Sequence, residues 1–181
     1  MRRLSCPATL FLSAFCLVGM SLTSCSPSPK IPRAICQTPI SRKLSAAILQ
    51  PTDGIRERTS SGFGKPGQWS YCKVYVGEEQ AMEIKLATHG GSMDPMKAAY
   101  PGDAVFRLQN PRRIHLADDA VVGDDGAIAT TRCLDSSGAD HFTLTLKVTR
   151  GRADAQRRVV IERFMRAYMP ATVKSLHCLR K

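Results

Sequence analysis

The spacing of four cysteines constrains the fold of this chain more than any other feature. Cys36, Cys72, Cys133 and Cys178 are separated by 36, 61 and 45 residues. Zinc and redox sites place their cysteines close together in the chain, so these intervals exclude the tight C-x-x-C geometry. An even set of widely spaced cysteines in an exported chain indicates structural disulfides. We therefore expect two bridges that join distant segments of one domain.

Four cysteines allow three pairings. The loop-closure estimate is about 4 kcal/mol for each bridge of the sequential pairing, Cys36–Cys72 and Cys133–Cys178, and the interleaved and nested pairings lie within about 1 kcal/mol of it. Chain entropy therefore does not choose between the pairings. We favour the sequential one because each bridge would tie a helix end to a neighbouring strand.

The first 24 residues have the layout of a signal peptide, and cleavage of this peptide would remove Cys6 and Cys16. Arg2 and Arg3 precede an apolar segment, residues 8–22, of about 15 residues, whereas a membrane-spanning helix needs about 20. The run at 22–25, Leu-Thr-Ser-Cys, resembles a bacterial lipobox, where small residues precede a cysteine that is acylated. The sequence predicts lipidation of Cys25. The alternatives are a plain secretory signal and a twin-arginine signal.

The rest of the chain divides into a tether and one domain. Residues 25–35 are rich in Ser and Pro, a composition that favours an extended, solvated chain. Residues 36–181 have the length of a single domain. Two acyl chains hold a protein stably on a bilayer, so we expect the domain to lie on the outer face of the cytoplasmic membrane, anchored through Cys25. A soluble secreted protein is the alternative.

The formal charge is +11, and loss of the signal peptide leaves +9. Residues 150–181 carry nine Lys or Arg against two acidic residues. Because the chain is expected to be exported, we expect no nucleic-acid partner. A tethered basic surface favours an anionic envelope component, and another envelope protein is a further candidate partner. The candidate contact residues of this region are Arg157, Arg158, Arg163 and Arg166. The alternative is a solvated helix face that aids solubility.

Periodicity predicts an α+β domain with an antiparallel sheet of about five to six strands and a helix at each end. Thr38 and Pro39 are typical of a helix start, and Gln50-Pro51 would end that helix. The second helix spans 155–168, and Pro170 stops or kinks it. The strands are expected at 69–76, 80–86, 104–108, 113–116, 120–122, 127–133 and 142–148, with the first two forming a hairpin.

The hairpin carries an aromatic stripe. Trp69, Tyr71 and Tyr75 share the face opposite Cys72, because side chains alternate along a strand. Tyr and Trp concentrate at contact surfaces, so these three are candidate contact residues. The alternative is that a helix covers the stripe.

No set of nucleophile, base and orienting group is evident. The stretch at 89–92, His-Gly-Gly-Ser, resembles an esterase oxyanion loop, but no G-x-S-x-G elbow accompanies it. The acidic pairs at 118–119 and 124–125 are explained by hairpin turns rather than by a calcium loop. We predict no catalytic residue, metal or cofactor, and hence a non-catalytic accessory or binding protein. A small extracytoplasmic hydrolase is the alternative.

The order of these features is similar to that of a group of small actinobacterial lipoproteins of unknown function. The matching stretches are the lipobox and linker, Cys36, Cys72, Pro101–Val105 and Gly126–Cys133. The resemblance implies an exported, lipid-anchored accessory protein, and it implies no particular activity or ligand. Cys133 and Cys178 depart from the pattern of the group.

Overall fold

The computed structural model describes residues 30–60, 70–100, 107–134, 138–176 and 178. The elements in chain order are β1 (Ala34–Ile35), β2 (Thr38–Pro39), α1 (Arg42–Leu49), β3 (Ile55–Thr59), β4 (Ser70–Val76), β5 (Glu79–His89), α2 (Pro95–Ala98), β6 (Arg112–Ile114), β7 (Asp119–Val122), β8 (Gly126–Arg132), β9 (His141–Val148) and α3 (Ala155–Ser175). The α+β class is confirmed.

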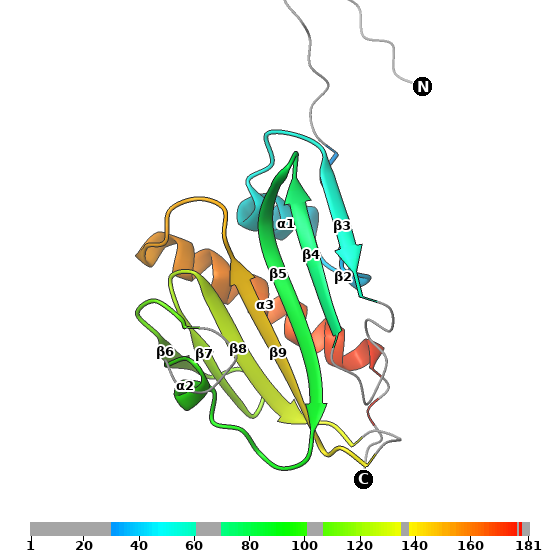
Figure 1. The fold of residues 1–181 in the computed structure, drawn as a ribbon, viewed down its shortest axis with the longest axis vertical. Coiled ribbons are helices and arrows are strands. Elements are labelled where there is room, and N and C mark those ends of the chain that lie inside the picture. The colour runs from blue at the N-terminus through cyan, green and yellow to red at the C-terminus, as the bar shows by residue number, and fades with distance from the viewer. Residues whose placement is uncertain (1–29, 61–69, 101–106, 135–137, 177, 179–181) are drawn as a thin grey trace, which may run out of the picture.

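A seven-stranded antiparallel sheet organises the domain, in the order β3-β4-β5-β9-β8-β7-β6. The strands β3, β4 and β5 form one meander, and β6, β7, β8 and β9 form a second. The two meanders are joined by the pairing of β5 with β9, from Met82↔Val148 to His89↔His141. The connection from β5 to β6 contains α2 and leads to the far edge of the sheet (Figure 1). The two central strands therefore come from opposite halves of the chain.

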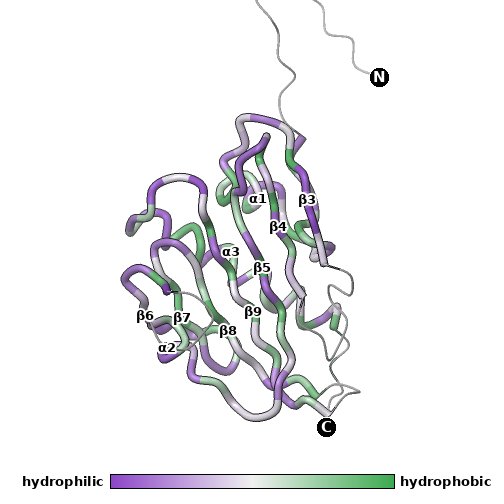
Figure 2. The backbone as a smooth tube through the Cα atoms, in the orientation of Figure 1, coloured by the Kyte–Doolittle hydropathy of each residue, from purple (hydrophilic) through white to green (hydrophobic). Residues whose placement is uncertain are grey.

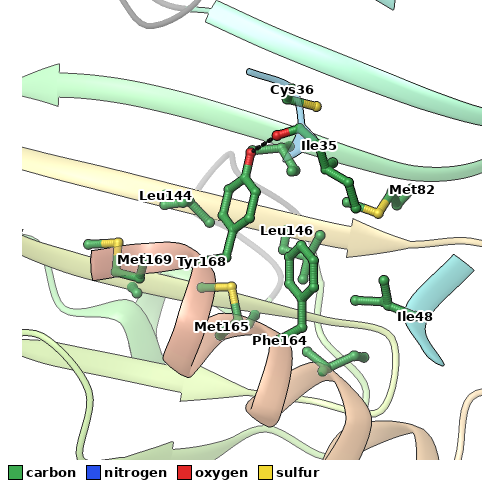
Figure 3. Packing of buried hydrophobic residues seen from close by; sticks show 14 of the residues in the cluster. Ile35, Cys36, Ile48, Met82, Leu144, Leu146, Phe164, Met165, Tyr168 and Met169 are labelled. Carbon is green, nitrogen blue, oxygen red and sulfur yellow. Dashed lines mark hydrogen bonds between the residues drawn. The ribbon is translucent and has the colours of Figure 1, made fainter. Parts of the chain in front are cut away.

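Helices α1 and α3 lie on one face of the sheet, which we call the inner face (Figure 1). Alternating side chains of the central strands point to this face, because the side-chain period of a strand is two. The side chains that α3 buries against them are those of Ile161, Phe164, Met165, Tyr168 and Met169, and Figure 3 shows four of these beside Leu144 and Leu146 of β9. This apolar contact forms the main core.

The β1–β2 hairpin is part of the same core. The hydroxyl of Tyr168 donates a hydrogen bond of 2.9 Å to the carbonyl of Ile35 (Figure 3), and burial raises the pKa of Tyr168 well above its usual range. The Oγ1 atoms of Thr38 and Thr172 lie 3.3 Å apart. Because Ile35 is fully buried, the folded part begins within the stretch predicted as tether.

Both disulfides have the sequential pairing that the sequence favoured. Cys36 is bonded to Cys72, which ties the β1–β2 turn to β4. Cys133 is bonded to Cys178, which ties the end of β8 to the segment after α3. The second bridge joins a strand to a helix end, as expected, whereas the first joins a hairpin turn to a strand.

The predicted start of the first helix is wrong. Thr38 and Pro39 form β2, and the N-cap of α1 is Ser41, whose Oγ accepts a hydrogen bond from the Leu44 N–H at 3.3 Å. The cause is tertiary, because burial of Thr38 beside α3 commits it to the hairpin. The predicted helix end at Gln50 is confirmed, since Gln50 is the C-cap.

The second helix is longer than predicted. α3 continues through Pro170 to Ser175, although proline inside a helix costs about 3 kcal/mol. Met169 and Thr172 are buried on either side of Pro170, and this packing offsets the cost.

The sheet has seven strands, which is more than the five to six expected, and it includes one strand, β3, that was not predicted. β3 reads Ile-Arg-Glu-Arg-Thr and has no apolar alternation; its backbone pairs with β4 from Ile55↔Val76 to Thr59↔Cys72. Of the strand predicted at 104–108, residues 104–106 lie outside the described residues, and Leu108 is a buried loop residue.

The face opposite α1 and α3, the outer face, is covered only in part. α2 packs there against Val121 of β7 and Ile128 of β8 in a second apolar cluster. No described helix covers the outer face over β3, β4 and β5 (Figure 1). The edge strand β3 is hydrophilic, whereas much of β8 is hydrophobic (Figure 2). Among the described residues, no helix is both long and apolar enough to span a membrane.

Candidate functional site

The uncovered part of the outer face carries tyrosines and cations. Along β4, Cys72, Val74 and Val76 are buried, and the residues between them point to the outer face. Tyr71 is 43 % exposed, which makes it one of the most exposed large apolar side chains of the described chain. The surface, which we call the tyrosine–cation face, consists of Arg56, Arg58, Tyr71, Lys73, Tyr75, Glu83 and Lys85.

Each tyrosine of this face lies beneath a cation. The guanidinium carbon of Arg58 is 5.4 Å from the centre of the Tyr75 ring, and Nζ of Lys73 is 5.6 Å from that of Tyr71. Such contacts contribute about 0.5–1 kcal/mol each at exposed sites. Each ring therefore favours one position of a long cationic side chain.

The two cations lie directly opposite each other, because Arg58 pairs with Lys73 across β3 and β4. Like charges in this position destabilise a sheet. Two acidic groups lie nearby. Glu83 of β5 lies directly opposite Lys73 in the strand register and 3.6 Å from Lys85, and Glu78 lies 2.9 Å from Arg56. Among the described residues, neither Arg58 nor Lys73 forms an ion pair with a carboxylate.

The structure brings together two of the three predicted aromatic residues. Tyr71 and Tyr75 share the face, as predicted, and Trp69 lies outside the described residues. Sequence reasoning missed Arg58 and Lys73. The alternating charges of β3 were the one feature of the sequence that could have pointed to Arg58. They place Arg58 beside the tyrosines only when β3 is known to pair with β4.

The arginines predicted as a basic contact surface lie on α3, across the sheet from the tyrosines, so the two sets do not form one surface (Figure 1). Arg158 contacts the buried Asp124 at 3.2 Å. Arg166 pairs with Glu162 at 2.7 Å and donates to a backbone carbonyl at 2.9 Å. Arg163 is exposed. Two of the predicted contact residues, Arg158 and Arg166, therefore make contacts within the domain.

Arg157 is the unusual member of this group. Its side chain is buried, with the residue 8 % exposed, and Nε and Nη2 have no hydrogen-bond partner among the described residues. Burial lowers the pKa of Arg157, while the charge of Asp154 opposes that shift. Asp154 itself caps α3 by accepting the Arg157 backbone N–H at 2.9 Å. Within the described part of the chain, the guanidinium is therefore a buried charge without a direct ion pair.

A polar pocket of about 640 Å³ lies near the end of β9 and is lined by His141, Arg113 and Arg132 together with three aspartates. Arginines neutralise the aspartates: Arg113 contacts Asp94 and Asp119, and Arg132 contacts Asp118. The hydrogen bond from His141 holds the pKa of Asp140 below its usual range. These contacts account for each carboxylate without a metal or a catalytic base.

One hydroxyl lies against an imidazole, but it is inaccessible. Nε2 of His89 lies 2.8 Å from Oγ1 of Thr143, and Nδ1 lies 3.0 Å from the carbonyl of Gly91. A nucleophile must reach its substrate, and Thr143 is only 5 % exposed. The contact therefore fixes the loop at 89–91 to β9.

A metal-like grouping of Cys36, Glu57 and Cys72 is a structural contact. The two sulfurs are bonded to each other, which leaves the carboxylate without thiolate neighbours. Glu57 accepts the Cys36 backbone N–H at 3.1 Å, and burial raises its pKa.

Comparison of the chain with models of known families, with curated proteins and with solved structures found no match.

We predict that Arg157→Met stabilises the fold. Replacing a buried charge that lacks a partner with an apolar side chain of similar length removes a desolvation cost of about 1–3 kcal/mol. Urea unfolding would show a midpoint above that of the unchanged chain. Arg163→Met, at an exposed position of the same helix, is the control and should change stability by less than about 0.5 kcal/mol. A lower midpoint for Arg157→Met would show that the guanidinium has a stabilising partner.

Proposed function

We propose that this chain is a lipid-anchored, non-catalytic binding protein of the cell envelope, located on the outer face of the cytoplasmic membrane. One observation carries the binding role: Tyr71 and Tyr75 lie on an outer face that no described helix covers, each beneath a cation. Ordering a long side chain costs conformational entropy. Side chains that are already positioned lose less of it when a partner binds, so this arrangement favours binding.

The disulfides support export, because such bonds form and persist in oxidising compartments. The lipobox-like run at 22–25 supports the anchor, and the likeness to small actinobacterial lipoproteins agrees with it. Between Cys25 and β1 the tether would reach roughly 30 Å at 3.1 Å per residue. The domain would therefore work close to the bilayer.

The geometry supports binding rather than catalysis. The hydroxyl beside His89 is buried, and the aspartates near His141 are held by arginines. Arg56, Arg58 and Tyr71 of the tyrosine–cation face are exposed in the described part of the chain, which is unlike a site that excludes water from a reaction. An open charged face suits reversible recognition of a large partner.

The anchor is tested by replacing Cys25. Cys25→Ser removes the thiol that carries the diacylglyceryl group, so labelling with a radioactive fatty acid should be lost and the protein should leave the membrane fraction. Cys16→Ser, inside the predicted signal peptide, is the matched control and should keep the label. Membrane retention unchanged by Cys25→Ser would refute the anchor.

The contact surface is tested by site-specific cross-linking in living cells. A photoreactive phenylalanine analogue at position 71 should give an adduct with an envelope component, because Tyr71 lies on the proposed surface. The same analogue at position 100 is the control, since Tyr100 is 54 % exposed and lies outside this surface. Adducts from position 100 but none from position 71 would contradict the proposal.

A further inference from the structure

We infer that the tyrosine–cation face binds a polyanionic chain that carries repeated phosphodiester groups. The inference names the ligand class of the surface described above, and it rests on the proposed binding role. The cations of this face outnumber the acidic groups beside them, and Tyr71 is the one exposed large hydrophobic residue of the described chain that lies on it.

The cations form a small array rather than a single site. Directly opposite residues such as Arg58 and Lys73 have Cβ atoms about 5 Å apart. Arg56 lies two residues from Arg58 on the same face, which corresponds to about 7 Å along a strand. On the side of β4 away from β3, Lys85 of β5 lies directly opposite Tyr71 in the strand register. The backbone positions that carry these cations are therefore about 5–7 Å apart in two directions, so the face presents several cations to a chain of repeated anionic groups.

The opposed pair has a repulsion that an anion would relieve. Arg58 and Lys73 are opposite in the strand register, and among the described residues no carboxylate forms an ion pair with either; the Arg58 guanidinium lies over Tyr75 and Nζ of Lys73 lies over Tyr71. A phosphodiester carries one negative charge shared by two oxygens, so successive phosphodiester groups of a chain can each accept from one of the two cations. Since the cations already lie over the rings, we expect the ligand to contact the charges and not to stack on the tyrosines.

The neighbouring acidic groups leave the centre of the array positive. Glu83 lies beside Lys85, and the pair of Arg56 with Glu78 is exposed, with side-chain exposures of 50 % and 95 %. Exposed pairs of this kind contribute only about 0–1 kcal/mol. Arg56 therefore exchanges Glu78 for a ligand phosphate at little cost.

A membrane surface fits this face less well. Peripheral segments that enter a bilayer present several large apolar side chains to it. The exposed large hydrophobic residues of the described chain are Tyr71, Tyr100 and Val159, and only Tyr71 lies here. The composition of the face is mixed with respect to a protein partner, because tyrosine and arginine are enriched at protein interfaces whereas lysine is depleted there and the array contains two lysines.

The test uses the full chain held by its anchor in nanodiscs of phosphatidylcholine, and the probe is synthetic poly(glycerol phosphate). Polymer binding should weaken as salt rises. The double variant Arg58→Gln/Lys73→Gln should bind at least about tenfold more weakly and should lower the slope of log affinity against log salt by about one to two, because two phosphate contacts are lost. Arg163→Gln on α3 is the matched control and should change binding by less than about twofold. Equal losses in the two variants, or no binding, would overturn the assignment.

Two competitors separate the ligand classes. Polygalacturonate, which repeats carboxylates, should displace the polymer at least about tenfold less well, and equal displacement would overturn the preference for phosphate. Vesicles of phosphatidylglycerol with phosphatidylcholine should displace it weakly, and strong displacement would assign the face to a membrane.

If the chain does not enter the discs, the anchor of the proposed function fails. Polymer binding is then measured with the chain immobilised through a C-terminal tag, where loss in the double variant still supports the assignment.

Discussion

The packing of α3 against the inner face of the sheet is the contact on which the rest of the structure depends. The helix buries Phe164, Met165, Tyr168 and Met169 against strands from both halves of the chain. It also holds the β1–β2 hairpin through the hydroxyl of Tyr168. Because the two longer helices, α1 and α3, lie on one side of a single-layer sheet, this contact decides which residues of the central strands β5 and β9 are buried in the main core.

The open outer face follows from this one-sided packing. A sheet needs one buried apolar face, and an antiparallel sheet tolerates water on the other. α2 covers the outer face only over β7 and β8, so β3, β4 and β5 remain free to present polar and aromatic side chains. On β4, the same alternation that buries Val74 places Lys73 and Tyr75 on the opposite side.

The sequence predicted the features that depend on local periodicity. The hairpin of β4 and β5 and most of α3 could be read from alternation and spacing. The cysteine pairing was predicted correctly, but the spacing alone left three pairings open, and the first bridge joins a hairpin turn to a strand. Features that depend on distant contacts could not be read. β3 is a strand because its backbone pairs with β4, and α3 passes Pro170 because Met169 and Thr172 are buried. For the same reason, the opposition of Arg58 and Lys73 became visible only with the register of β3 and β4.

The central claim is that the sheet is covered on its inner face and open over β4 on its outer face. Hydroxyl-radical footprinting with mass spectrometry tests it most directly, since all the reporters are tyrosines of one chain. The account predicts rapid oxidation of Tyr71, slower oxidation of the partly buried Tyr75 and protection of Tyr168, which is fully buried. Protection of Tyr71 and Tyr75 in the isolated protein, or ready oxidation of Tyr168, would contradict it.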